Sequence, residues 1–227
     1  MTSSDETIDA GRYRVAPGLI STLRGFLYAT AAASLAGAIA ASNEARLVAD
    51  VMAGDGGMVR RLVDAEEVTE AVLAVFSLAA LVTGILAVIW WYQTYRVVET
   101  SGAANRKWSA GWAVGGWFIP FANFIIPKLV LNEMERVLIA AEEGSTEWRN
   151  RRVSAITSWW WALFVIAAIV FGAGLGMSDG QLDGEFAFDA DLYLLGVRAT
   201  ALGMAISTAA ALVGAAAMKR LGRMASR

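Results

Sequence analysis

The sequence predicts an all-α protein that crosses a membrane with four helices. Of its 227 residues, 57% are hydrophobic and only 18% are charged, with a mean hydropathy of +0.50. Soluble domains are nearer half apolar and a quarter charged. The apolar residues gather in four long runs, and no stretch alternates apolar and polar residues over the length of a strand. We therefore expect a multi-pass helical bundle with a re-entrant or kinked central segment and one cytoplasmic interfacial helix.

The N-terminal part predicts an arm, a span and a loop. Residues 1–18 are polar and end in Pro-Gly, which predicts a disordered cytoplasmic arm, and residues 19–42 form the first predicted transmembrane helix. Ala38-Ile39-Ala40 resembles a signal-peptide cleavage site, but the long, partly acidic region before the run favours an uncleaved span. Residues 43–70 are acidic and contain three glycines, so we expect an extracytoplasmic loop.

Three further apolar runs give the other spans. Residues 71–92 make a helix of about 33 Å, enough for a hydrocarbon layer of about 30 Å. A cytoplasmic loop is predicted at 93–110. Spans at 154–176 and 192–218 flank an acidic extracytoplasmic loop at 177–191, and a basic cytoplasmic tail follows at 219–227.

The central segment, 111–127, is apolar but is interrupted by glycine and proline. As a helix, its core would span only about 22 Å, too short for a full crossing. Pro120 removes a backbone donor and clashes with the preceding turn. After Pro127, residues 128–144 predict an interfacial helix, because Leu131, Met134 and Leu138 recur at helical spacing. Its two basic and four acidic residues disfavour binding to anionic lipid.

Lys and Arg favour the cytoplasmic side of a membrane, and this rule separates two topologies. If residues 111–127 re-enter, 15 Lys and Arg lie inside and 3 outside, with both termini cytoplasmic in the plasma membrane. If they cross, the best arrangement has an external N-terminus and a 12 to 6 division. The re-entrant arrangement is favoured and the five-span arrangement stays open. All nine Trp lie between Trp90 and Trp161, which predicts anchoring at the interface.

Composition excludes several kinds of chemistry. The chain has no Cys and no His, which removes disulfides, zinc sites with thiolate or imidazole ligands, and Ser-His-Asp triads. Its net charge of −2 gives no footprint for nucleic acid. No glycine-rich phosphate loop is present, so no cofactor is expected. We expect the protein not to be an enzyme.

Residues 90–137 carry a family resemblance. The most specific part is Trp112-Ala-Val-Gly-Gly-Trp-Phe-Ile-Pro-Phe-Ala-Asn123, followed by Pro127 and a polar helix with Glu133. This stretch resembles the bacterial membrane proteins of the domain-of-unknown-function family 4328, and the resemblance extends over roughly residues 65–217. It implies a multi-pass membrane protein without an established activity, and no catalytic residues are transferred.

The central segment supplies most of the candidate site residues. Non-helical backbone at membrane depth must be sheltered by protein or reached by water. The segment therefore either lines a solute path or, as we favour, braces the bundle. Asn123 is expected to satisfy backbone carbonyls left free by the two prolines. The candidate residues here are Trp112, Gly115, Gly116, Trp117, Pro120, Asn123 and Pro127.

Two charged residues, Glu133 and Arg198, complete the candidates. Glu133 and Glu135 are the only carboxylates near the segment in sequence, and we expect them to project from opposite faces or into solvent. Arg198 is the one strong charge inside a predicted span. Intramembrane charges often mark function, but snorkelling or an ion pair is favoured here. The expected ion-pair partners are Asp191, Glu66, Glu67 and Glu70.

Ladders of small residues predict close helix packing, either within the chain or in a homodimer. One ladder lies in the first span, one in the last, and a third comprises Ala168, Gly172 and Gly176. The first and last spans are therefore candidates to be neighbours. The favoured function is interaction or scaffolding in the plasma membrane, with the bilayer and a protein partner or second copy as binding partners. The alternative is a small solute channel or transporter around Pro120 and Asn123.

Overall fold

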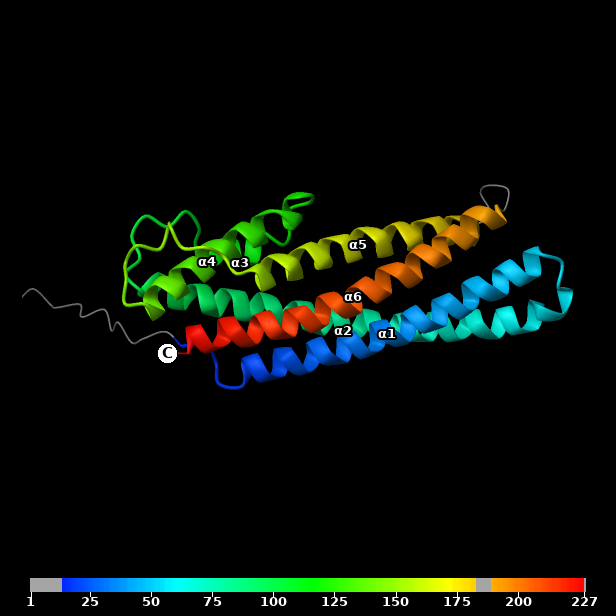
Figure 1. Ribbon diagram of the computed structural model, residues 1–227, viewed down its shortest axis with the longest axis horizontal. Coiled ribbons are helices and arrows are strands. Elements are labelled where there is room, and N and C mark those ends of the chain that lie inside the picture. The colour runs from blue at the N-terminus through cyan, green and yellow to red at the C-terminus, as the bar shows by residue number, and fades with distance from the viewer. Residues whose placement is uncertain (1–13, 183–188, 227) are drawn as a thin grey trace, which may run out of the picture. The chain divides into compact units, whose positions relative to one another are not determined.

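The computed structural model describes residues 14–182 and 189–226, and every regular element in these ranges is helical. Four helices are long and apolar enough to cross a membrane, as predicted (Figure 1). They are α1 (Leu19–Met52), α2 (Val59–Thr100), α5 (Ala155–Leu182) and α6 (Ala190–Ala225). The fold class is therefore confirmed as all-α with four candidate membrane spans.

The chain divides into two compact units. The hairpin unit contains Met1–Thr22, Ile85–Ser154 and Met218–Arg227, and the bundle unit contains Leu23–Gly84 and Ala155–Ala217. The hairpin unit includes the shorter helices α3 (Ala110–Gly115), η2 (Ala122–Phe124) and α4 (Ile126–Glu142). Each unit has its own packing and its own cavities.

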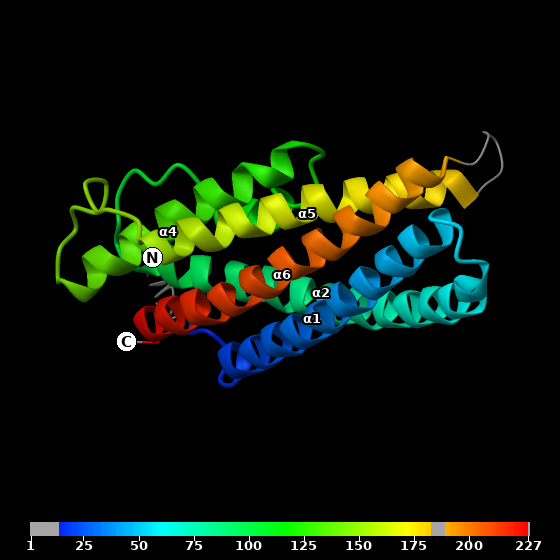
Figure 2. The same ribbon diagram turned by 45° about the vertical axis from the view of Figure 1, so that its right-hand side comes forward.

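The bundle unit is formed by parts of α1, α2, α5 and α6, which pack against one another. Hydroxyl pairs join α1 to α2 and to α6: Thr30 Oγ1 lies 2.8 Å from Thr83 Oγ1, and Ser34 Oγ lies 2.9 Å from Thr208 Oγ1. The ribbon of α1 runs beside that of α2 (Figure 2). Phe76 of α2 meets Phe171 of α5 edge to face, with ring centroids 5.5 Å apart. The predicted neighbours, the first and last spans, do lie side by side within one chain.

Glycines permit the close approach of α5 and α6. A Cβ on Gly203 would lie 2.6 Å from the main-chain nitrogen of Phe171, and one on Gly174 would lie 2.5 Å from that of Thr200. Gly172 and Gly176 of the predicted ladder on α5 have open space around their Cβ positions, so they make no close helix contact within the described part of the chain. The spacing identified small residues but did not identify which of them face a neighbour.

The predicted acidic loop at 43–70 is mostly helical. α1 continues to Met52, a short 3-10 helix η1 (Gly56–Met58) follows, and α2 begins at Val59. Helix α1 continues because Glu44, Ala45 and Val48 are buried, the latter two in a core cluster with α6 residues. The turn depends on Gly54, at φ +98°, and on the Asp55 carboxylate, which accepts the Gly57 N–H at 3.1 Å.

The other predicted loops and the tail are also shorter than expected. α2 extends to Thr100 into the predicted loop at 93–110, and α5 extends to Leu182 into the predicted loop at 177–191. The predicted tail at 219–227 belongs largely to α6. Hydropathy identifies only the apolar part of a helix, whose length is set by the thickness of the lipid. The same helix can continue through polar residues outside the lipid, and this continuation does not appear in a hydropathy profile. Most of the predicted arm, 1–13, and residues 183–188 lie outside the described residues.

The central segment consists of α3 and a turn that leads into α4, and it is not one kinked helix. α3 and α4 pack side by side after the chain reverses between them (Figure 1). Pro120 lies in the turn, and Pro127 lies in the first turn of α4, where a missing N–H is harmless. Phe121 sits at φ +62°, a conformation that is strained for a bulky side chain. α3, the turn and α4 therefore form a hairpin, of which residues 111–127 supply the first arm and the tip.

Tryptophan positions differ from the prediction of interface anchoring. Five of the nine are buried within the protein, so they pack against other side chains instead of contacting the membrane interface. These are Trp90, Trp91, Trp148, Trp160 and Trp161. Trp112 and Trp159 are exposed and remain available as anchors.

Candidate functional site

Glu133 is buried on α4 and ties three parts of the hairpin unit together. Its side chain is 6% exposed, contrary to the expectation that it points into solvent. Oε2 accepts the main-chain N–H of Lys107 at 2.8 Å, and Oε1 accepts that of Trp108 at 3.1 Å. Oε1 also accepts the Tyr95 hydroxyl from α2. A carboxylate with this many donors serves as a structural anchor for the segment that precedes α3.

Glu135 is fully buried two residues later, with a different set of partners. It forms an ion pair with Arg220 of α6, and its Oε1 accepts the Ser154 N–H at 3.2 Å. Its Oε2 is buried without a hydrogen-bond partner in the described part of the chain. Lys128 lies on the same helix, where burial lowers the pKa of its ammonium group and the Glu135 carboxylate opposes that shift.

These inward carboxylates change the charge of the surface around α4. The sequence counted four acidic residues on this helix, but two of them face the protein interior and carry partners there. Helical spacing predicted one apolar face correctly, since Leu131, Met134 and Leu138 are buried. It gave no sign that Glu133 and Glu135 are also buried, because their donors come from segments far away in sequence.

A cavity of about 470 Å³ opens beside Glu133 in the hairpin unit. We call it the basic cavity. Its cationic lining residues are Lys107, Arg136 and Arg149, and its aromatic ones are Trp108 and Trp148. Lys107 Nζ lies 5.2 Å from the Trp108 ring centroid, and the Arg149 guanidinium lies 5.5 Å from that of Trp148. The lining therefore combines positive charge with flat aromatic surface.

The hairpin between α3 and α4 ends in an exposed apolar tip. Phe118 is 75% exposed, Phe121 is 87% exposed and Ile125 is 61% exposed. Oδ1 of Asn123 is buried without a hydrogen-bond partner among the described residues. The Asn123 main chain takes part in the turn, since its N–H donates to the Ile119 carbonyl at 2.9 Å.

The remaining predicted residues of the segment have separate packing roles. A Cβ on Gly116 would lie 2.6 Å from Ile126 Cγ2, so this glycine permits α3 to approach α4, while Gly115 has open space. The Trp117 ring stands edge to face against Trp91, with centroids 5.3 Å apart. Trp112 stacks in the same manner against Trp108 at 5.6 Å. The structure brings the segment together with Glu133, but Arg198 belongs to the bundle unit.

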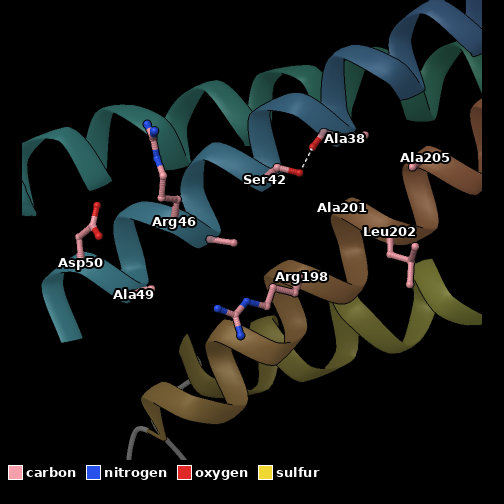
Figure 3. Close-up of a pocket in the computed structure, with 10 residues that line it drawn as sticks. Ala38, Ser42, Arg46, Ala49, Asp50, Arg198, Ala201, Leu202 and Ala205 are labelled. Atoms are coloured by element: carbon pink, nitrogen blue, oxygen red, sulfur yellow. Dashed lines mark hydrogen bonds between the residues drawn. The ribbon is translucent and has the colours of Figure 1, made fainter. Parts of the chain in front are cut away.

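Arg198 lies at a groove of about 580 Å³ between α1 and α6 (Figure 3). Small residues line most of it, together with the exposed side chains of Arg46 and Asp50. Figure 3 shows Arg46 extending from α1 away from α6, so the two guanidinium groups do not face each other. Ion pairs among the described residues do not include Arg198 and its predicted acidic partners. Its exposed position fits the favoured expectation of snorkelling.

A buried acidic group in the bundle unit escaped the sequence analysis. Glu44 is 4% exposed on α1, and the Tyr193 hydroxyl donates to its Oε1 at 3.0 Å. The same hydroxyl lies 3.4 Å from Oε1 of Glu66 on α2. Tyr193 thereby links three helices of the bundle. Helical periodicity over 41–48 could have found Glu44, because it occurs among small residues that face α6.

Comparison with known proteins supports the family resemblance. The model of the family described as domain of unknown function (DUF4328) matches residues 58–223, slightly more of the chain than the resemblance predicted. Neither the curated proteins nor the solved structures give a match.

Proposed function

This chain belongs to the DUF4328 family, a domain of unknown function, and we propose that it is a non-catalytic interaction protein of the bacterial plasma membrane. Its four candidate membrane spans make it a membrane protein. In the proposed arrangement, the bundle unit lies largely in the bilayer and the hairpin between α3 and α4 enters the bilayer from the cytoplasmic side. The rest of the hairpin unit offers the surface for binding.

The apolar hairpin tip is the observation that carries this proposal. Phe118, Phe121 and Ile125 expose large apolar side chains together, whereas exposed apolar patches on proteins generally mark contacts with a partner or with lipid. The hairpin is also held firmly at its base by the buried Glu133. A rigid, apolar projection of this kind is suited to shallow insertion at the boundary between headgroups and acyl chains, where water still reaches the backbone of the turn.

The distribution of charge supports the orientation. Of the Lys and Arg residues in the described part of the chain, all but five belong to the hairpin unit. The five in the bundle unit are Arg24, Arg46, Arg60, Arg61 and Arg198. Because positive residues tend to remain on the cytoplasmic side of bacterial membranes, this distribution supports our assignment of the hairpin unit and both termini to that side.

A fluorophore on the tip tests the placement of the hairpin. The chain has no Cys, so Phe121→Cys gives one labelling site for an environment-sensitive dye in reconstituted vesicles. We expect blue-shifted emission, as in a lipid environment. Thr146→Cys, at an exposed position after α4, is the matched control and should show emission typical of water. Emission from position 121 equal to that of the control would refute insertion.

Flux measurements separate this proposal from a channel. A pore around the hairpin would require polar groups, but its exposed side chains are largely apolar. We expect Pro120→Ala and Asn123→Ala to leave the passage of small solutes across vesicle membranes unchanged. Flux through the wild-type protein that both substitutions abolish would favour the channel. A scaffolding role also requires a reproducible partner, or a second copy, after crosslinking in native membranes.

A further inference from the structure

We propose that the basic cavity binds the phosphate headgroup of an anionic glycerophospholipid. The cavity measures about 470 Å³, within the range of sites that hold small organic groups. Three cations line it, Lys107, Arg136 and Arg149, against the single carboxylate of Glu133. This inference rests on the proposed function for its lipid part, because it uses the placement of the hairpin in the bilayer.

The cavity has an excess of positive charge. Glu133 supplies one negative charge and its hydrogen-bond donors are neutral groups, so three cations face one carboxylate. Ion pairs in the described part of the chain involve Arg96, Arg151 and Arg220, and none of the three cavity cations. Clustered cations without carboxylate partners attract an anion, which restores local neutrality.

Arg136 supplies a second guanidinium group to the lining, beside that of Arg149. Its Nε is buried and has no hydrogen-bond partner among the described residues. Because that nitrogen is shielded, a ligand in the cavity would be bound through the terminal nitrogens of the group. Guanidinium groups bind phosphate through two parallel N–H···O bonds, a geometry that the compact ammonium of lysine does not provide. Arg136 and Arg149 together give two such groups.

An apolar path leads from the cavity along the hairpin. Leu129 lines the cavity and is 41% exposed, and Ile125, one helical turn earlier, is 61% exposed. Leu129, Asn132, Glu133 and Arg136 follow one face of α4 at three- and four-residue spacing. A ligand with a phosphate in the cavity therefore has an apolar surface beside it for an acyl chain. This combination favours a phospholipid over a soluble phosphate compound.

Binding is measured on the full chain in a neutral detergent by native mass spectrometry. The probes are dioleoylphosphatidylglycerol, dioleoylphosphatidylcholine and glycerol 3-phosphate. We expect phosphatidylglycerol to bind at least about tenfold more tightly than phosphatidylcholine, and Arg136→Gln to remove about that factor. Arg152→Gln removes the same charge from an exposed position outside the cavity and is the matched control, with an expected loss below about twofold.

Several outcomes would overturn the proposal. Equal losses in Arg136→Gln and Arg152→Gln would mean that general surface charge attracts the lipid. Equal affinity for the two phospholipids would exclude recognition of the anion. Glycerol 3-phosphate that binds as tightly as phosphatidylglycerol, with the same dependence on Arg136, would identify a soluble phosphate compound as the ligand.

Two controls keep these outcomes interpretable. If Arg136→Gln does not fold, Arg136→Lys retains the charge without the paired donors and should give an intermediate affinity. The dye at position 121 tests hairpin insertion separately. Water-like emission there, with Arg136-dependent binding of glycerol 3-phosphate retained, would refute the proposed placement while leaving the phosphate site intact.

Discussion

Glu133 and Glu135 show how two neighbouring buried carboxylates are compensated in different ways. Glu133 receives neutral donors from Lys107 N–H, Trp108 N–H and the Tyr95 hydroxyl. Glu135 receives a cation, Arg220, and one main-chain N–H. Burying a charge is costly unless it is paired or hydrogen-bonded, so both arrangements fix their donors in place. The two residues thereby join the ends of several segments to α4.

Replacing Glu133 should destabilise the protein strongly. Glu133→Ala removes the acceptor of three donors, and we expect a loss of about 2–4 kcal/mol in the free energy of unfolding. Glu133→Gln retains one oxygen and should lose about 1–2 kcal/mol. Denaturation in mixed micelles, followed by tryptophan fluorescence, gives both values. Glu147→Ala removes an exposed carboxylate and should change stability by less than about 0.5 kcal/mol. Similar losses for both alanine variants would contradict the anchoring role.

Lys128 predicts a dependence of stability on pH. Burial lowers the pKa of its side chain in the folded protein below 10.5, so the unfolded state binds more protons. Stability should therefore rise as the pH increases from the lowered folded pKa toward 10.5. Lys128→Met lacks this dependence and should be more stable than the wild type at pH 7, by a margin that narrows toward pH 10. Thermal unfolding of both proteins across this pH range measures the difference in their stability. A difference that stays constant with pH would show that burial does not lower the pKa of Lys128.

At the scale of helices, packing distances decide which small residues matter. The repeats of small residues correctly predicted that α1 and α6 are neighbours. On α5 they did not identify the residue that packs within the chain, because Gly174 approaches α6 and Gly172 does not. A four-residue repeat contains no information about the rotation of a helix about its axis when both faces carry small side chains. Only the neighbouring helix determines which face is used.

A matched pair of glycine substitutions tests this distinction. Gly203→Ala places a Cβ 2.6 Å from the Phe171 nitrogen, which forces α5 and α6 apart. We expect a loss of about 1–3 kcal/mol. Gly172→Ala meets open space and should be neutral, or stabilise by up to about 1 kcal/mol through helix propensity. Thermal unfolding in detergent compares the two variants. If Gly203→Ala is as stable as Gly172→Ala, the close contact between these helices is absent.

The same reasoning explains which parts of the hairpin were predictable. Gly-Gly and Pro120 correctly indicated that residues 111–127 do not form a continuous helix. The role of Glu133 could not be found, because its donors lie 25 to 38 residues away along the chain. Charge counting over 128–144 was misleading for a related reason. It treats every acidic residue as part of the surface, although Glu133 and Glu135 are buried.

For the whole molecule, the hydropathy pattern was sufficient to predict the four long helices but not their lengths. Lipid requires about 20 apolar residues per crossing, and the sequence shows those runs directly. Helix α2 has 42 residues and is about 63 Å long, roughly twice the hydrocarbon thickness. Its polar ends are stabilised by packing within each unit, for example around the fully buried Tyr95. Such contacts between distant segments are not visible in a hydropathy profile.

The uneven distribution of charge predicts that positions 53 and 146 lie on opposite sides of the membrane. Ala53→Cys lies in the exposed turn of the bundle unit, and Thr146→Cys lies in the hairpin unit. With the hairpin unit in the cytoplasm, a membrane-impermeant maleimide should label position 53 in intact cells and position 146 only after the cells are opened. Labelling of 146 alone would show the reverse orientation. Labelling of both positions would place them on one side, and the segment between them, including α2 and the hairpin, would then cross the membrane an even number of times.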